Sequence, residues 1–164
     1  MSIAGLHRWE GESLVPIDFC DPRDYRVEVV DSFLVSDGTA FALALHRERF
    51  QYSALIRGRG FGGFAQLDIP AFSAAGLAVI PDSGNWFPRF ELQSAKGSAQ
   101  LLFRHRAAPE LSRAAVLTTL DRPDPRRVPG IKGPDVDVLV SARTAARQRG
   151  ADDAAILTSD GYVV

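Results

Sequence analysis

The stretch "NWFPRFELQSAKGSAQLLFRHRAAP", residues 85–109, has the pattern of two β-strands joined by the short turn "AKG" at 95–97. A second pair of β-rich runs, within 24–45, is joined by Ser36-Asp37-Gly38, and an Asp-Gly pair between apolar runs is a strong hairpin signal. Two more short strands are expected around Gly11. Strands joined by such short turns are antiparallel, so the pattern favours antiparallel hairpins over parallel βαβ units.

Helices are expected between the hairpins. The period changes to helical spacing over 46–58. A second helix is expected within 68–84, with Asp68 as its N-cap and Pro70 in its first turn. A third is expected over 135–149, followed by Gly150 as a C-terminal cap. Antiparallel hairpins with packed helices predict an α+β fold.

A linker is the clearest boundary in the chain. The segment "DRPDPRRVPG", 121–130, combines three prolines with charged residues and a glycine. We therefore expect an N-terminal α+β domain over 1–120, an interdomain linker over 121–131, and the beginning of a second, incomplete domain over 132–164. A third hairpin, around Asp160-Gly161, is expected to end with the chain.

Composition excludes several classes of function. The net charge of −1 provides no field that would attract nucleic acid or an anionic membrane. No run of 18 apolar residues is present, and the N-terminus lacks a secretory pattern. The single cysteine, Cys20, and three scattered histidines provide no metal-binding cluster. The sequence predicts a cytoplasmic protein without a metal, a nucleic-acid partner or a membrane partner.

Lysine is rare in this chain, which has 19 basic residues but only two lysines, Lys96 in the turn "AKG" and Lys132. Lys132 stands between Gly130 and Gly133, which let the backbone approach a ligand closely. A lysine amine can act as a nucleophile when it is uncharged, whereas arginine cannot. From the residues alone, Lys132 is either such an amine facing a carbonyl cofactor or a solvated lysine in an ordinary interdomain loop.

Three segments, in this order, resemble the class IV (fold type IV) aminotransferases. These pyridoxal-phosphate enzymes include branched-chain and D-amino acid aminotransferases and aminodeoxychorismate lyase. The segment "VVDSFLVSDGTAFALALHRERF", 29–50, resembles the family's first hairpin and helix, and "GNWFPRFEL", 84–92, resembles lyase-like members. Lys132, the helix after it, "GADDAAIL" (150–157) and "SDGYVV" (159–164) resemble the start of the family's second domain.

The resemblance implies specific roles for three residues. Lys132 would form the Schiff base with pyridoxal 5′-phosphate and move the proton at the substrate α-carbon. Arg49 would bind the cofactor phosphate, because a planar guanidinium suits an oxyanion. His46 is expected to be structural. The chain departs from many members at Asp137, where they carry a tyrosine beside the cofactor ring.

The resemblance also implies a fold, an activity and partners. The fold would be the N-terminal domain of the D-amino acid aminotransferase-like fold, with the start of the second domain. The activity would be that of a transaminase or a 4-amino-4-deoxychorismate lyase-like enzyme, which forms an external aldimine and removes the Cα proton, leading to transamination or pyruvate elimination. The substrate would be an amino acid or an aminodeoxychorismate-like molecule.

The family's glutamate at the pyridinium nitrogen and its later phosphate-binding loops would follow Val164. The partner is therefore expected to be a second copy in a homodimer, or a complementary C-terminal fragment. The alternative is a non-catalytic family member that acts as a binding or assembly module, since an open strand edge invites pairing.

Overall fold

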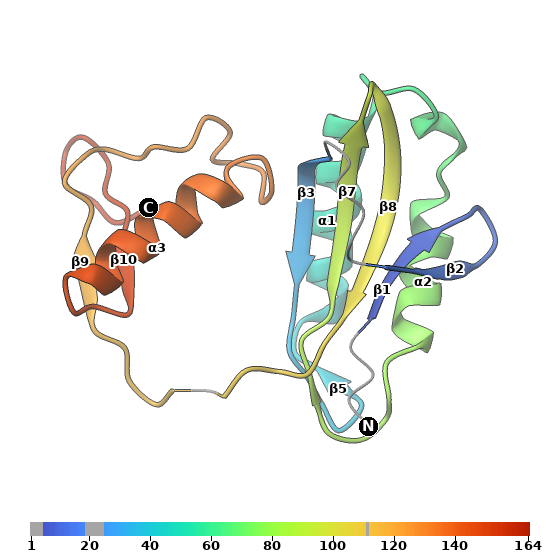
Figure 1. The fold of residues 1–164 in the computed structure, drawn as a ribbon, viewed down its shortest axis with the longest axis horizontal. Coiled ribbons are helices and arrows are strands. Elements are labelled where there is room, and N and C mark those ends of the chain that lie inside the picture. The colour runs from blue at the N-terminus through green and yellow to red at the C-terminus, as the bar shows by residue number, and fades with distance from the viewer. Residues whose placement is uncertain (1–4, 19–24, 111) are drawn as a thin grey trace. The chain divides into compact units, whose positions relative to one another are not determined.

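The computed structural model describes residues 5–18, 25–110 and 112–164. These residues form two compact units, Met1–Pro109 and Glu110–Val164 (Figure 1). Cys20 lies outside the described residues. No described helix is long and apolar enough to cross a membrane.

The main element of the first unit is an antiparallel sheet. Among the described residues it has five strands in the order β2-β1-β8-β7-β3. Their bounds are β1 Gly5–Trp9, β2 Leu14–Ile17, β3 Arg26–Ser32, β7 Arg89–Ala95 and β8 Ser98–His105. The predicted hairpin over 85–109 is confirmed, and its turn residues Lys96 and Gly97 have φ of 48° and 82°. Two successive positive φ angles match the twist of the flanking strands, which is why a glycine stands there.

A smaller sheet holds the predicted Asp37-Gly38 turn. It has the order β5-β4-β6, with β4 Val35–Ser36, β5 Thr39–Ala40 and β6 Asn85–Trp86. The sequence suggested one long hairpin over 24–45. Instead, β3 pairs with β7, the chain then passes into β4, and a helix already begins at Leu43. The alternating pattern could not show this, because it does not specify which strand becomes the neighbour.

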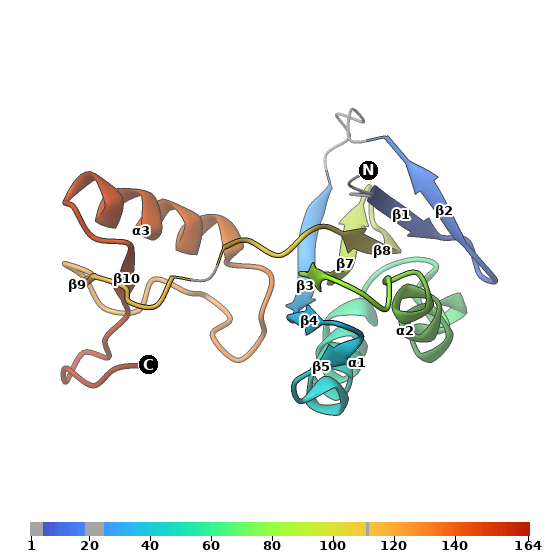
Figure 2. The ribbon, with the colours of Figure 1, turned by 90° about the horizontal axis from the view of Figure 1, so that it is seen from below.

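Two α-helices, α1 (Leu43–Gly58) and α2 (Ile69–Ala78), cover one face of the main sheet (Figure 2). A short 3₁₀ helix, η1 (Phe64–Gln66), lies between them in the chain. The predicted cap of α2 is confirmed, since Asp68 Oδ1 accepts the Ala71 amide at 2.8 Å. Four fully buried aromatic side chains form the centre of the core: Phe50, Phe72, Phe90 and Phe103.

The second unit contains β9 (Leu117–Thr119), α3 (Val136–Gln148) and β10 (Asp153–Ala155). The helix and its cap at Gly150, where φ is 81°, agree with the prediction. The strands β9 and β10 pair in parallel, which the hairpin pattern did not predict. The third hairpin is present in short form: Leu157 and Val163 form an antiparallel bridge, and Thr158 N donates to Tyr162 O at 2.8 Å.

The division between the units differs from the predicted boundary. The sequence assigned residues up to 120 to the first domain, whereas the first unit ends at Pro109 and β9 lies in the second. The physical reason is that β9 pairs with β10, 36 residues further along in register (Leu117 with Asp153). The prolines of 121–130 mark irregular backbone, but they do not reveal which strand pairs with which.

Candidate functional site

Arg49 on α1 is clamped by a buried carboxylate on β3. Its Nε donates to Asp31 Oδ2 at 2.6 Å and its Nη2 donates to Asp31 Oδ1 at 2.8 Å. The Asp31 side chain has an exposure of 0%, whereas that of Arg49 is 52% exposed. A bidentate pair of this kind fixes both the distance and the plane of the guanidinium. The hydrogen bond to Asp31 is the main cause that raises the pKa of Arg49, so this group stays cationic.

His46 completes the same cluster one helical turn earlier. Its Nδ1 lies 2.7 Å from Asp31 Oδ1 and 3.2 Å from Arg49 Nη2. Its ring also packs on the ring of Phe33, with 5.4 Å between centroids. The spacing of three residues places His46 and Arg49 on one face of α1, so that both reach the same carboxylate. The structure therefore brings His46 and Arg49, which the sequence analysis singled out, together through Asp31.

Arg49 faces an open hollow along α1. The hollow is lined by Phe41, Ala42, Leu45, His46, Glu48, Arg49 and Tyr52. The apolar members are unusually exposed for their type, with Phe41 at 91% and Tyr52 at 69%. Among the described residues, the third guanidinium nitrogen of Arg49, Nη1, has no hydrogen-bond partner. The hollow thus presents a fixed cation beside aromatic and aliphatic surface.

A second carboxylate–arginine pair joins the same two elements further along. Arg57 Nη2, near the end of α1, donates to Glu28 Oε2 at 2.5 Å, and Ser94 Oγ donates to Glu28 Oε1 at 2.7 Å. Glu28 is buried, with 5% exposure. Both pairs attach α1 to β3, but of these four residues only Arg49 is among those that line the hollow. The Glu28 pair is therefore a structural counterpart against which the Asp31 pair can be tested.

Lys132 lies in the second unit, in a bend that leads into α3, and it is exposed. The backbone on either side is fixed by hydrogen bonds: Ile131 N donates to Val128 O at 3.0 Å, and Val136 N donates to Gly133 O at 3.0 Å. Gly133 is buried even though Lys132 beside it is exposed. The bend therefore holds the backbone in place and directs the lysine side chain to the surface of this unit.

Asp135 anchors this bend across its base. The carboxylate is 3% exposed, and its Oδ2 accepts the Val128 amide at 2.8 Å. That hydrogen bond is the main cause that lowers the pKa of Asp135. Asp135 stands at the N-cap position of α3 but makes no side-chain cap, because its carboxylate accepts the amide of residue 128 instead.

The sheet face opposite the helices carries a charged cluster that the sequence did not single out. Glu91 is buried and lies 3.0 Å from Arg104 Nε and 3.2 Å from Arg89 Nε, and it also accepts from Gln93 at 2.7 Å. Burial is the main cause that lowers the pKa of Arg89, and the charges of Arg104 and Arg106 lower it further. Positive charge is thus concentrated around one buried carboxylate.

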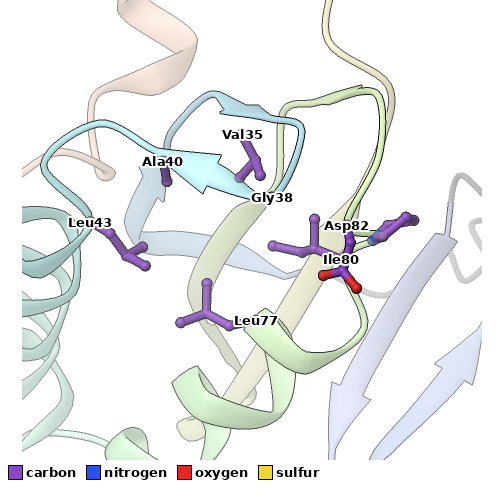
Figure 3. A pocket seen from close by; sticks show the side chains of 8 residues that line it. Val35, Gly38, Ala40, Leu43, Leu77, Ile80 and Asp82 are labelled. Carbon is purple, nitrogen blue, oxygen red and sulfur yellow. The ribbon is translucent and has the colours of Figure 1, made fainter.

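Another concavity lies between the β4–β5 turn and the end of α2 (Figure 3). Val35, Ala40 and Leu43 line one side, and Leu77 and Ile80 line the other. Asp82 is the ionisable residue among its lining residues. A small apolar hollow with one carboxylate offers little for catalysis, so the candidate chemistry lies with Arg49 and Lys132.

Sequence reasoning singled out Arg49, His46 and Lys132 and missed Asp31 and the anchoring contact of Asp135. A signal for Asp31 was present, because a carboxylate interrupts the apolar run "VEVVDSFLV" at 27–35. Such a residue in a buried strand needs a cationic partner, and Arg49 follows on the next helix. The contact between Asp135 and Val128 has no comparable signal, because a loop closure of seven residues leaves no periodic pattern.

The sequence matches no protein-family model and no curated protein. Solved structures do match. A fold IV transaminase from Curtobacterium pusillum has a TM-score of 0.75 at 23% identity, over 98% of this chain and 65% of that one. A PLP-bound hypothetical aminotransferase from Mycobacterium tuberculosis has a TM-score of 0.71 at 18% identity, over 98% and 64%. A mutant branched-chain amino acid aminotransferase from Thermobaculum terrenum has a TM-score of 0.70 at 15% identity, over 99% and 60%.

These matches show the fold. They extend over nearly all of this chain, and they include both of its units. The chain spans 60–65% of the length of the three solved structures. The predicted α+β class is confirmed, together with its assignment to the N-terminal portion of the fold-type IV architecture.

Proposed function

We propose, from this shared fold, that the chain is part of a pyridoxal-phosphate-dependent enzyme of the fold-type IV transaminase kind. The observation that carries the proposal is the match over 98% of the chain to an aminotransferase whose structure is described as PLP-bound. The same protein also matches in a form with α-ketoglutarate and PMP bound. We propose pyridoxal 5′-phosphate as the cofactor, with Lys132 and Arg49 as the residues of this chain that hold it.

The residues present fit this cofactor. A phosphate needs a fixed cation with free N–H groups, and Arg49 presents Nη1 at the open hollow while Asp31 holds its other edge. The exposed apolar side chains beside it, including Leu45 and Tyr52, suit an aromatic ring. An aldehyde needs a primary amine, and of the two lysines Lys132 is the one to which the family resemblance gives this role; its bend is held by backbone hydrogen bonds on both sides.

Pyridoxal phosphate, when bound, supplies an electron sink for the substrate α-carbon. Lys132 would hold the cofactor aldehyde through Nζ and, once released by the substrate amine, would carry the proton removed from the α-carbon. Arg49 would bind the phosphate and so fix the position of the ring. Asp135, by anchoring residue 128, would hold the Lys132 bend in place.

We propose amino-group transfer as the reaction, with an amino acid as the donor. The structural neighbours described above are transaminases, which supports transfer over pyruvate elimination from an aminodeoxychorismate-like substrate. Two assays distinguish amino-group transfer from pyruvate elimination: a panel of amino acids with 2-oxoglutarate as acceptor, and incubation with aminodeoxychorismate. Formation of glutamate supports the proposal, whereas release of pyruvate from aminodeoxychorismate without transfer supports the lyase.

The test of the cofactor lysine uses the full gene product. The protein is incubated with pyridoxal phosphate, reduced with borohydride and digested, and the adduct is located by mass spectrometry. We expect the adduct on Lys132 and its loss in Lys132→Ala. Lys96→Ala is the matched control, because Lys96 is the other lysine and lies in the exposed β7–β8 turn. An adduct on Lys96, or none at all, would contradict the proposal and favour a non-catalytic binding module.

A further inference from the structure

We infer that Asp31 is a positioning residue, which sets the orientation of Arg49 toward the cofactor phosphate. The inference rests on the proposed function. It starts from a buried carboxylate, since Asp31 has an exposure of 0% near the C-terminal end of β3. A buried charge is tolerated only when it is paired and hydrogen-bonded. Asp31 meets that condition with three contacts, from Arg49 Nε, Arg49 Nη2 and His46 Nδ1, at 2.6–2.8 Å.

The geometry of the pair decides which edge of Arg49 is available. A guanidinium is planar, and its donors have a fixed arrangement. Asp31 occupies the edge formed by Nε and Nη2, so Nη1 remains for a ligand on the edge turned away from the carboxylate. A flexible, half-exposed arginine would have to be ordered when it binds an anion. The clamp orders Arg49 in advance, and preorganisation of this kind strengthens binding.

Charge alone would predict the opposite effect of Asp31. Its carboxylate offsets the charge of Arg49, so a purely Coulombic account has Asp31 weaken anion binding. Removal of Asp31 would then tighten the binding of a phosphate. The positioning account predicts weaker binding, because the guanidinium loses its fixed orientation. The two accounts therefore differ in the sign of the effect.

A purely structural role is the other reading, in which Asp31–Arg49 merely attaches α1 to β3. Glu28–Arg57 provides the matched control, because it joins the same helix and strand through a buried carboxylate. Glu28 and Arg57 are not among the residues that line the Arg49 hollow. Loss of either pair removes one attachment of α1, but only loss of Asp31 changes the orientation of Arg49.

The experiment compares the affinity for pyridoxal 5′-phosphate with that for pyridoxal, which lacks the phosphate. The dissociation constant for pyridoxal divided by that for pyridoxal 5′-phosphate measures phosphate recognition, so a smaller ratio means weaker recognition of the phosphate. Loss of stability does not by itself change this ratio. We expect Asp31→Asn to reduce the ratio roughly tenfold, by analogy with the lower end of the losses seen when a metal-binding side chain loses the partner that orients it. We expect Glu28→Gln to leave the ratio unchanged, and Arg49→Gln to reduce it at least as far as Asp31→Asn does.

Asp31→Glu covers the case in which Asp31→Asn fails to fold. It keeps the buried charge paired but moves the guanidinium by one methylene, so it should also reduce the ratio. A wild-type ratio in a folded Asp31→Asn or Asp31→Glu variant, or a ratio above wild type, would overturn the inference. The proposed function would still stand if Arg49→Gln reduced the ratio. A wild-type protein with no preference for the phosphorylated form would overturn the proposed role of Arg49 and the inference with it.

Discussion

Replacement of Asp135 by alanine should loosen the Lys132 bend without unfolding α3. The carboxylate accepts the Val128 amide at 2.8 Å, and a hydrogen bond to a charged group contributes about 1.5–3 kcal/mol. Val128 is only half-buried, so water can replace the lost acceptor and the lower end applies. The ion pair with Arg127 adds little, because it is 3.7 Å long and Arg127 is 73% exposed. We therefore expect a loss of about 1.5 kcal/mol for closure of the bend.

Native-state hydrogen exchange measures this loss directly. A local opening that costs about 1.5 kcal/mol less makes the amide exchange roughly tenfold faster. We expect that acceleration at Val128 in Asp135→Ala, with little change at Ala146 in the buried part of α3. Asp137→Ala is the control, because Asp137 is an exposed acidic residue in the first turn of the same helix, whereas the Val128 amide donates to Asp135.

Two results would refute this reasoning. If exchange at Val128 were unchanged in a folded Asp135→Ala variant, Asp135 would not hold the bend closed. If Asp137→Ala accelerated hydrogen exchange at the Val128 amide as much as Asp135→Ala does, the effect would come from the negative charge at the start of α3 and not from the hydrogen bond to Asp135. The adduct yield at Lys132 under limiting pyridoxal phosphate then shows whether the bend also affects the amine.

Three further outcomes are expected. Phe90→Ala should lower the free energy of unfolding of the first unit by about 3–5 kcal/mol in urea denaturation, because Phe90 is fully buried against several rings. Phe90→Leu should lower it by less than about 1.5 kcal/mol. Gly58→Ala should cost about 1–3 kcal/mol, because a Cβ there would lie 2.0 Å from the Phe64 ring, whereas Gly60→Ala, with no atom within 4 Å, should be nearly neutral in the same assay. The ionised carboxylate of Asp135 stabilises the closed bend at any pH above the ordinary aspartate pKa of about 3.9, and this stabilisation is lost as the pH falls through its lowered pKa. Acid should therefore reduce the protection of the Val128 amide against hydrogen exchange. Asp135→Asn should remove that pH dependence.

The sequence by itself determined the features that depend on near neighbours in the chain. The turn at Lys96-Gly97 and the cap of α2 at Asp68 could be predicted, because each depends on residues at most three positions apart. The helical face that carries His46 and Arg49 could be predicted for the same reason, since residues three apart lie together on a helix. Arg49 and Lys132 were singled out by residue type and by resemblance, and their proposed roles remain predictions.

Only the tertiary structure decided the contacts that join distant segments. The parallel pairing of β9 with β10 depends on how α3 folds back, and the period of a strand does not identify its partner. Asp31 and Arg49 are 18 residues apart on different elements, and their pair forms because β3 and α1 pack together and leave the buried carboxylate no solvent. A charge in a buried strand can be recognised from sequence, but the cation that satisfies it is fixed by packing.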